Sequence, residues 1–354
     1  MIAEVHPAFP VDAFLADVLD GYEALELLPR GRKIAEVLHR HLPPTYPEAV
    51  RILVDSMGPK LTHTEGNGMA PFLYMPHAVF VAEYGLDHFE ASMAAQYAIT
   101  QRFTAEFSMR PFLEQHPEMT LARLAAWTED ASEHVRRLVS ECTRPRLPWA
   151  SRLRAFQRDP SPVLALLERL KDDPSLYVRR SVANNLNDIG KDHPDVLVEV
   201  AGRWMEEASA ERQWLVRHAL RSLVKQGHPG ALAVLGFGGT ANVRLSDIAL
   251  TPERMAIGDA VVVSFAITNP EPETQRVLVD FQVHYQKANG TTRPKVFKLK
   301  ALELAPGETI RLRKKVSVKN MTTRTHYPGL HRVDALLNGR AEPLGAFNLT
   351  RASA

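Results

Sequence analysis

The feature that most constrains the fold of this chain is a helical phrase that occurs more than once. Residues 134–141 read HVRRLVSE, residues 177–188 read YVRRSVANNLND, and a weaker copy, LVRHALRS, covers residues 215–222. The valines that precede the arginines are 43 and 38 residues apart, a period typical of two-helix solenoid repeats of the HEAT type. Such repeats stack into a curved array of helices with one concave face. The first part of the chain is therefore predicted to be an α-solenoid.

Each phrase has an apolar side and a polar stripe when it is placed on a helix of about 3.6 residues per turn. In the second phrase Arg180, Asn184 and Asp188 are spaced four residues apart and share the stripe. In the first phrase Arg137 and Glu141 occupy the matching positions. The stacked helices should thus present arginines and carboxylates on one surface. This surface is either the ordinary solvated face of amphipathic helices or a binding surface.

Helical spacing also predicts helices upstream of the phrases. One covers residues 12–28 and ends near Pro29, and another covers residues 86–107. Glu106 lies near the end of the second helix, four residues before Arg110, and this spacing favours a surface ion pair between them.

A proline-rich segment follows the first phrase. Residues 143–152 read TRPRLPWASR, and the two prolines end the preceding helix and hold the segment extended. The segment also brings Arg144, Arg146 and Arg152 near Trp149. The tryptophan either plugs the junction between repeats or forms an aromatic and cationic wall against which a nucleic acid stacks.

The pattern changes at the glycine cluster GFGG, residues 236–239, after which apolar residues alternate with polar ones. Short runs separated by turn residues predict an immunoglobulin-like β-sandwich. The expected strands cover residues 243–249, 260–268, 277–286, 295–302, 309–318, 331–337 and 344–350. We therefore expect a helical domain over residues 1–236, a linker over residues 237–242, and an Ig-like domain over residues 243–354.

Charge is distributed unevenly between the two parts. After Thr240 there are 17 lysines and arginines against 10 acidic residues, whereas the first 240 residues have 26 against 31. Contact of the helical part with a polyanion would therefore need local clusters of arginine and help from the basic second part. The lysines and arginines of the strands either protect sheet edges or face phosphates.

The cysteine content and the lack of long apolar segments indicate where in the cell the protein works. Cys142 is the only cysteine, which excludes a disulfide framework and a cysteine-based zinc site. The first ten residues lack the basic and apolar regions of a signal peptide, and no apolar run approaches membrane-spanning length. We expect a protein of the bacterial-type cytoplasm, at the nucleoid, with no membrane partner.

Three long stretches carry a resemblance to a known family. They are VRRLVSECTRPRLPWA (135–150), YVRRSVANNLNDIGKDHP (177–194) and YGLDHFEASMAAQYAITQRFTAEFSMRPFL (84–113). They resemble the AlkC branch of the HEAT-like DNA glycosylases, and the appended sandwich is similar to the longer AlkC subtype. The resemblance implies a monofunctional glycosylase of base excision repair. It would release cationic N3-alkylated purines, chiefly 3-methyladenine, from double-stranded DNA without base flipping and without a cofactor or metal.

The resemblance also implies active-site roles for four residues: Glu141, Asp188, Glu106 and Trp149. A purine methylated at N3 is already a cationic leaving group, so no acid is needed to protonate it. Carboxylates near the sugar would stabilise its oxocarbenium-like charge and orient or deprotonate the attacking water. Trp149 and Trp127 would pack against the lesion or its sugar. The arginines expected to hold DNA phosphates are Arg137, Arg144, Arg146, Arg152 and Arg180.

Two other functions remain open from the residues alone. A helical solenoid commonly docks a protein partner through its concave face without any chemistry. A lesion sensor would bind damaged DNA and release no base. In each case we expect a monomer, because no long apolar patch or heptad run suggests self-association.

Overall fold

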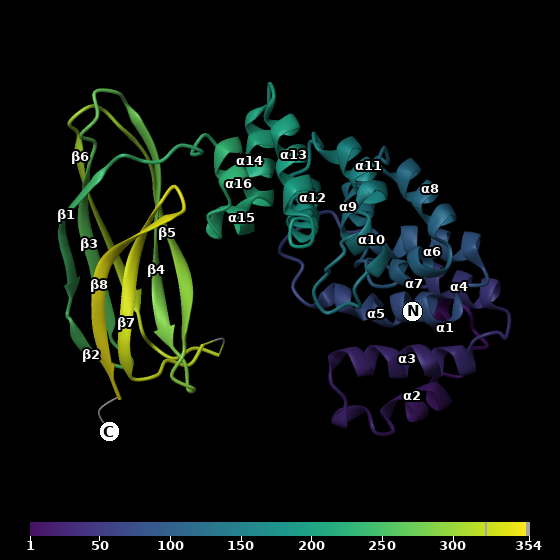
Figure 1. Cartoon of the computed structure of the whole chain (residues 1–354). Helices are drawn as coiled ribbons and strands as arrows, with labels where there is room; N and C mark the ends of the chain where they lie inside the picture. Colours follow the sequence, from purple (N-terminus) through teal and green to yellow (C-terminus); the bar gives the residue numbers. More distant parts are fainter. Residues whose placement is uncertain (323, 352–354) are drawn as a thin grey trace. The chain divides into compact units, whose positions relative to one another are not determined.

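A computed structural model describes residues 1–322 and 324–351 of the chain (Figure 1). Helices lie between residues 2 and 234, and strands between residues 244 and 350. The chain divides into two compact units, of which the first is Met1–Leu197 with Trp204–Ala219 and the second is Val198–Arg203 with Leu220–Ala354. The predicted order of a helical region followed by a β-sandwich is confirmed. In the described part of the chain, no helix has the length and apolar character needed to cross a membrane.

Short helices build the first unit. They are α1 (Ile2–Val5), α2 (Val11–Leu19), η1 (Tyr22–Ala24), α3 (Leu27–His41), α4 (Tyr46–Asp55), η2 (Ala70–Tyr74), α5 (Met75–Tyr84), α6 (Phe89–Thr100), α7 (Met109–Gln115), α8 (Pro117–Trp127), α9 (Glu133–Cys142), α10 (Arg154–Arg158), α11 (Ser161–Leu170), α12 (Leu176–Ile189) and α14 (Ala210–Ala219). Helix α13 (Pro194–Met205) contributes to both units, and the second unit contains α15 (Arg221–Lys225) and α16 (Pro229–Val234).

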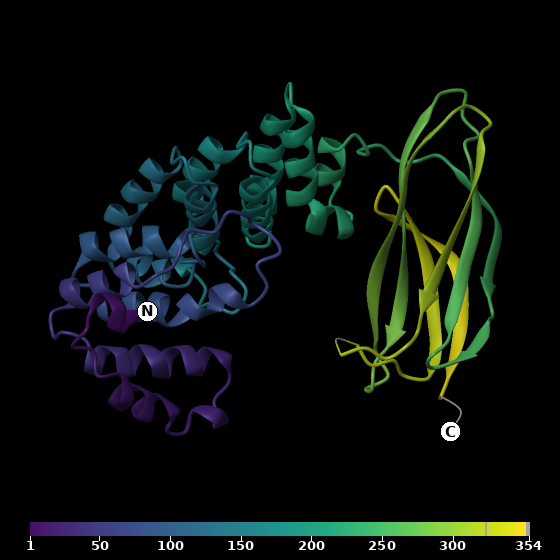
Figure 2. The same ribbon diagram turned by 180° about the vertical axis from the view of Figure 1, so that it is seen from behind.

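The helices that carry the repeated phrases lie next to one another. Helix α12 packs against α9 on one side and against α14 on the other, and Figure 2 shows these stacked helices from behind. Their apolar faces form the core as the spacing predicts, because every residue of these faces is at most 1% exposed. These residues are Val135, Leu138, Val139 and Cys142 in α9, and Val178, Val182, Leu186 and Ile189 in α12.

Helices α9 and α12 begin with the same local structure, and this structure accounts for the part of the phrase that the two helices share. An aspartate accepts a hydrogen bond from the backbone N–H of the N-cap serine, and the first arginine of the phrase donates to two carbonyls of the preceding connection. These residues are Asp130, Ser132 and Arg136 before and in α9, and Asp173, Ser175 and Arg179 before and in α12. The first arginine of each pair is therefore used for structure, and the second is left for the polar stripe.

The predicted helix end at Pro29 is wrong. Helix α3 begins at Leu27, so Pro29 lies in its first turn. Backbone N–H groups of the first turn have no acceptor within the helix, and proline is tolerated there for that reason. The residues between α2 and α3 form the short helix η1 instead of the end of one long helix.

The predicted helix over residues 86–107 is also too long. Helix α6 ends at Thr100, and the carbonyl of Gln101 accepts a hydrogen bond from the backbone N–H of Leu61. The first carbonyl past the helix end is thus bound to a distant segment. Glu106 therefore lies in the connection between α6 and α7 and not at the end of a helix.

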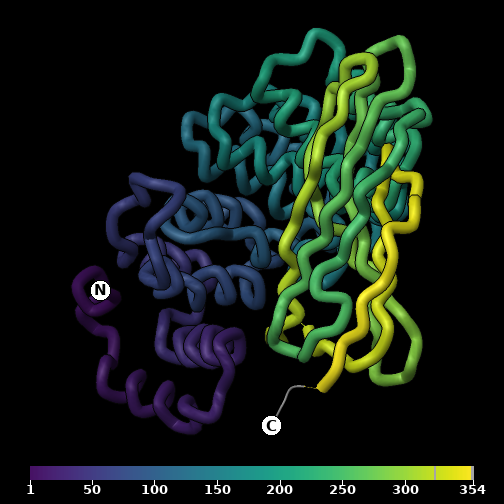
Figure 3. The backbone as a smooth tube through the Cα atoms, turned by 90° about the vertical axis from the view of Figure 1, so that its left-hand side faces the viewer, coloured from purple at the N-terminus to yellow at the C-terminus, as the bar shows by residue number. Residues whose placement is uncertain are grey.

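Two sheets form the sandwich of the second unit. One has the order β1-β3-β6 and the other β2-β8-β7-β4-β5. In Figure 3 the strands, coloured green to yellow, run lengthwise side by side. The strands are β1 (Arg244–Thr251), β2 (Arg254–Ala256), β3 (Ala260–Thr268), β4 (Gln275–Gln286), β5 (Thr292–Leu304), β6 (Thr309–Ser317), β7 (Gly329–Leu337) and β8 (Arg340–Thr350).

Alternation along the strands explains the sandwich core. Strand β4 points Val277, Val279, Phe281 and Val283 inward, and all four are fully buried. All seven expected strands are present, with somewhat different ends. The sequence prediction missed β2, because three residues are too few to establish an alternating pattern. The expected domain limits at residues 236 and 243 remain a prediction.

A buried histidine in α5 makes the stability of the fold depend on pH. His77 is 8% exposed, and neither ring nitrogen has a hydrogen-bond partner among the described residues. Burial lowers the pKa of His77 to about 4. An unfolded histidine has a pKa of about 6.5, so the unfolded chain takes up the proton first as the pH falls. The contribution of neutral His77 to the free energy of unfolding is therefore fully present above about pH 6.5 and is lost as the pH falls from about 6.5 to 4.

We expect His77→Phe to remove part of this pH dependence. Urea unfolding at pH 7.5 and pH 4.5 should show that the wild type loses about 2–3 kcal/mol more than the variant over this interval. His63 is exposed and serves as the control, because His63→Phe should leave the wild-type slope unchanged. Parallel losses in the wild type and the His77 variant would contradict the assignment.

Candidate functional site

Three carboxylates from separate elements meet in the first unit. Glu106 comes from the connection before α7, Glu141 from α9 and Asp188 from α12, and they are 8%, 6% and 1% exposed. We call these three residues the carboxylate cluster. Two guanidinium groups connect them. Arg137 lies 2.5 Å from Glu106 and 3.7 Å from Glu141, whereas Arg144 lies 2.6 Å from Glu141 and 2.8 Å from Asp188.

Glu141 is at the centre of the cluster and has the most donors. Besides its two arginines, it accepts a hydrogen bond of 2.6 Å from the hydroxyl of Ser181, which is buried on α12. Burial by itself would raise the pKa of Glu141, but Arg137, Arg144 and the Ser181 hydrogen bond together outweigh it and hold the pKa below its ordinary value. Glu141 is therefore held in its ionised form.

Glu106 has a different electrostatic environment. Arg137 and the hydroxyl of Thr104 both donate to one of its oxygens. Burial raises the pKa of Glu106, and Arg137 opposes this effect only in part. The predicted surface pair between Glu106 and Arg110 is wrong. Packing of α9 against the connection brings the guanidinium of Arg137, which is 31 residues away, to the carboxylate instead.

Asp188 completes the cluster from the last turn of α12. Arg144 donates to one of its oxygens at 2.8 Å, and the ammonium of Lys191 lies 2.7 Å from the other. Lys191 is three residues further along the chain and has an exposed side chain. Both oxygens of this buried carboxylate are thus matched by cations.

Trp149 lies in the loop between α9 and α10 and points outward. Its side chain is 86% exposed, so the interpretation as a plug between repeats is wrong. Its φ of 64° is in the left-handed region, which costs a residue other than glycine roughly 1–2 kcal/mol. Such backbone strain persists only where the surroundings enforce it, and it is frequent at functional sites. The loop therefore holds a large aromatic side chain in solvent at an energetic cost.

The loop carrying Trp149 is tied down at several points. Leu147 and Leu153 are buried on either side of the tryptophan. Arg146 forms an ion pair with Asp192, with 2.8 Å between Nε and Oδ2. These contacts supply the restraint that the strained backbone requires.

The other predicted site residues separate into buried and exposed groups. Trp127 is 9% exposed and packs against Tyr97 at 5.8 Å between ring centroids. It belongs to the core and leaves little surface for a lesion, and its expected contact with a lesion stays a prediction. The guanidinium groups of Arg137 and Arg144 are turned inward and paired with the carboxylate cluster. Their expected contact with phosphates stays a prediction.

Two predicted arginines remain accessible. Arg180 is 45% exposed and lies 3.0 Å from the carboxylate of Glu65. Arg152 is exposed, three residues after Trp149, and the structure describes no ion pair or hydrogen bond for its side chain. Arg152 is thus the cation nearest in sequence to Trp149 that is not already paired within the described residues. Sequence reasoning missed Thr104, Ser181 and Lys191, because nothing in their spacing marks them as partners of distant carboxylates.

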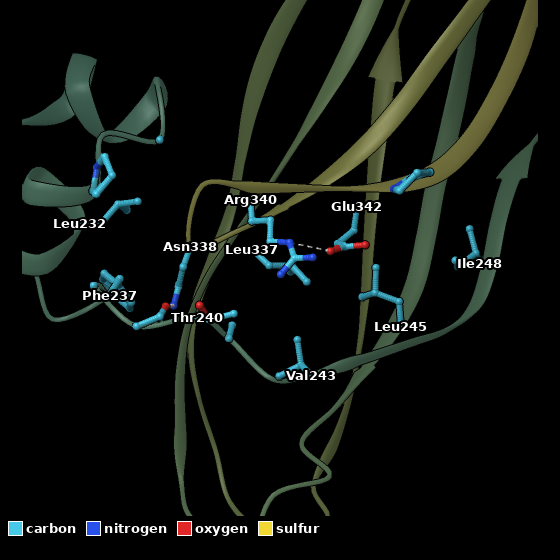
Figure 4. A pocket seen from close by; sticks show the side chains of 16 residues that line it. Leu232, Phe237, Thr240, Val243, Leu245, Ile248, Leu337, Asn338, Arg340 and Glu342 are labelled. Atoms are coloured by element: carbon cyan, nitrogen blue, oxygen red, sulfur yellow. Dashed lines mark hydrogen bonds and ion pairs between the residues drawn. The ribbon is translucent and has the colours of Figure 1, made fainter.

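The carboxylate cluster does not line either of two cavities found in the structure. A cavity of about 450 Å³ in the second unit is lined by apolar side chains, including Phe237 and Val243, and by the Arg340–Glu342 ion pair (Figure 4). Another of about 500 Å³ lies beside Ser132 in the first unit. In the described ranges no group of three or more His, Cys, Asp or Glu side chains is arranged to hold a metal ion.

Comparison with known proteins finds relatives along nearly the whole chain. Residues 244–351 match the family described as "Uncharacterised protein YhaZ, C-terminal Ig-like domain". The "Uncharacterized protein YhaZ" of Bacillus subtilis (strain 168) is 39% identical over 338 residues, which are 95% of this chain and 91% of the relative. The structure of Pseudomonas fluorescens alkylpurine DNA glycosylase AlkC bound to DNA containing an abasic site analog is 39% identical. Its TM-score is 0.90, and the match covers 99% of this chain and 95% of that chain.

Proposed function

Because this chain belongs to the AlkC family, in the form that carries a C-terminal Ig-like domain, we propose that it is an alkylpurine DNA glycosylase. We further propose that it releases cationic N3-alkylated purines, chiefly 3-methyladenine, from double-stranded DNA and does so without flipping the base. The observation that carries this proposal is the buried carboxylate cluster, in which paired arginines hold three carboxylates in fixed positions, where we propose that they face the sugar as it becomes cationic. The strained and exposed Trp149 supplies a second group suited to contact a nucleotide.

The chemistry that these residues support needs no acid. When the bond between C1′ and the purine nitrogen breaks, its electron pair goes to the purine and neutralises the positive charge of the leaving group. The sugar is left with oxocarbenium character, which fixed carboxylates stabilise more strongly in a site of low dielectric than in water. A water oxygen then adds to C1′, and one of its protons passes to a carboxylate.

The different environments of the carboxylates favour a division of roles. A proton acceptor works best when its pKa is raised toward the working pH, and the pKa of Glu106 is raised by burial. Glu141 is held ionised by its donors, which suits the stabilisation of positive charge. We therefore assign deprotonation of the water to Glu106 and charge stabilisation to Glu141 and Asp188.

Trp149 is proposed to contact the damaged nucleotide, with Arg152 on a neighbouring phosphate. We expect Trp149→Ala to weaken binding to a duplex containing an abasic-site analogue by about 1–3 kcal/mol, the range for loss of an aromatic stacking contact. Fluorescence anisotropy with a labelled duplex measures the change. Trp149→Phe keeps an aromatic ring and should recover part of the loss. Equal affinity of wild type and Trp149→Ala would remove Trp149 from the interface.

The direct test of the activity uses methylated DNA. The protein is incubated with duplex DNA treated with a methylating agent, and released bases are separated by chromatography. We expect 3-methyladenine above the level released spontaneously. Tight, salt-sensitive binding of the DNA with no release of base would favour the lesion sensor. No binding of DNA at low salt would favour a module that binds a protein.

A further inference from the structure

Arg110, on α7, is a buried cation with an unusual set of partners. It is 2% exposed, and the structure describes no ion pair between its guanidinium and a carboxylate. One terminal nitrogen donates to the carbonyls of Cys142 at 3.2 Å and Arg144 at 3.0 Å, and the other donates to the carbonyl of Ser151. All of its described hydrogen bonds thus go to backbone oxygens.

These three carbonyls mark the beginning and the end of one segment. Cys142 is the last residue of α9, Arg144 follows the helix end, and Ser151 lies two residues after Trp149. One guanidinium therefore joins both ends of the loop that carries Trp149. The first of these carbonyls is next to Glu141, and the second belongs to the arginine that holds Glu141 and Asp188.

Arginine is a costly side chain to bury at this position. Burial of a cation without a carboxylate partner is unfavourable, and burial lowers the pKa of Arg110. A cation at the C-terminal end of α9 recovers part of this cost through the last carbonyls of the helix. The guanidinium is a rigid, planar group with several donors, and it can therefore fix several backbone oxygens together. An apolar side chain of similar size cannot do this.

We infer that Arg110 is a positioning residue for the proposed glycosylase reaction: it clamps both ends of the Trp149 loop, so that Trp149 keeps its strained outward orientation and Arg144 stays on the carboxylates. The inference rests on the proposed function. Arg110 acts through these residues, since all of its described hydrogen bonds go to backbone carbonyls at the two ends of the loop.

The chain provides a matched control in Arg179. Its guanidinium also donates to two backbone carbonyls, those of Asp173 and Pro174, and its Nε is likewise buried without a partner among the described residues. The connection that it holds lies before α12, at the end of the helix opposite to Asp188. Arg179→Gln therefore removes a comparable backbone restraint away from the carboxylate cluster.

The first measurement is the single-turnover rate of base release at saturating enzyme, well below the unfolding temperature of each variant. We expect Arg110→Gln to be about 10²-fold slower than wild type, the scale for misplacement of a reacting group, and Arg179→Gln to be unchanged. Arg179→Gln should also leave the affinity for undamaged duplex unchanged. Arg110→Lys keeps the charge but has no planar fork, so its rate should lie between wild type and Arg110→Gln. If Arg110→Gln does not fold, Arg110→Lys carries the test.

The second measurement reports the loop itself and does not depend on activity. Protein labelled with 5-fluorotryptophan has four fluorine resonances, one for each tryptophan, and Trp149→Phe assigns the one of interest. We expect Arg110→Gln to shift or broaden the Trp149 resonance and to leave the other three in place, whereas Arg179→Gln should not affect it. An unchanged Trp149 resonance together with a wild-type rate would overturn the inference. If the wild-type protein releases no base, the proposed function fails, and the resonance still decides whether Arg110 holds the loop.

Discussion

Asp188→Asn should slow the single-turnover release of 3-methyladenine by about 10²–10³-fold, the scale on which one fixed electrostatic contact to a transition state contributes. The amide has nearly the same shape as the carboxylate but lacks its charge. Asp188 is 1% exposed, so solvent screens this charge very little. Binding of undamaged DNA should change by less than about threefold, because the charge matters mainly when the sugar becomes cationic.

Asp173→Asn is the matched control for this prediction. Asp173 is also a buried aspartate that is paired with an arginine, at 2.6 Å from Arg136. It belongs to the connection before α12 and not to the carboxylate cluster. Its substitution should lower stability and leave the rate of base release intact. Equal rates for the wild type and Asp188→Asn would remove Asp188 from the proposed mechanism, whereas equally slow rates for both variants would indicate a general loss of structure.

Arg144→Gln should lower the free energy of unfolding by about 3–5 kcal/mol at pH 7, because it removes a shared cation from two buried carboxylates. Without it, the nearest described cation of Glu141 is Arg137, at 3.7 Å, and Asp188 retains only Lys191 among its described cations. Urea unfolding of the wild type and the variant measures the difference. Base release should be slowed as well, since both carboxylates lose their orientation.

The destabilisation caused by Arg144→Gln should become smaller as the pH falls. Burial opposes ionisation of Glu141, but Arg137, Arg144 and Ser181 together hold its folded-state pKa below the ordinary value. The stabilisation is therefore present above about pH 4.5 and is lost as the pH falls through the folded-state pKa. The difference in unfolding free energy between wild type and Arg144→Gln should shrink from pH 7 toward pH 3.

An exposed ion pair provides the comparison for Arg144. Arg51 contacts Asp55 at 3.1 Å on helix α4, and their side chains are 65% and 49% exposed. Arg51→Gln should cost less than about 1 kcal/mol, as is usual for exposed pairs. If Arg144→Gln were as mild as Arg51→Gln at pH 7, the two carboxylates would not depend on the shared guanidinium.

Most arginines of the repeated phrase bind groups within the protein, although their charge suggests a surface that binds DNA. The first arginine of each pair, Arg136 or Arg179, ties down a connection. Of the second arginines, Arg137 binds carboxylates and only Arg180 stays exposed. DNA contact by the first unit is therefore proposed to rely on fewer free cations than the sequence suggests, with Arg152 next to Trp149 as the clearest of them.

The sequence alone determined the division into helices and strands, the repeat and the buried faces of α9 and α12. Each of these depends on periodicity within a short segment, which is visible in the order of residues. It also indicated Glu141, Asp188 and Trp149 through the resemblance of their flanking motifs. It did not indicate the end of α6, where the carbonyl of Gln101 accepts a hydrogen bond from Leu61, 40 residues away.

Only the tertiary structure decided which charges meet. Glu106 pairs with Arg137 across 31 residues, Arg144 with Asp188 across 44, and Arg110 with three carbonyls that lie 32 to 41 residues away. These partners depend on how successive repeats stack, and a helical wheel places a residue on a face without saying what that face contacts. The same stacking turned Trp127 inward and left Trp149 in solvent, because burial depends on the neighbours that packing supplies and not on the residue type.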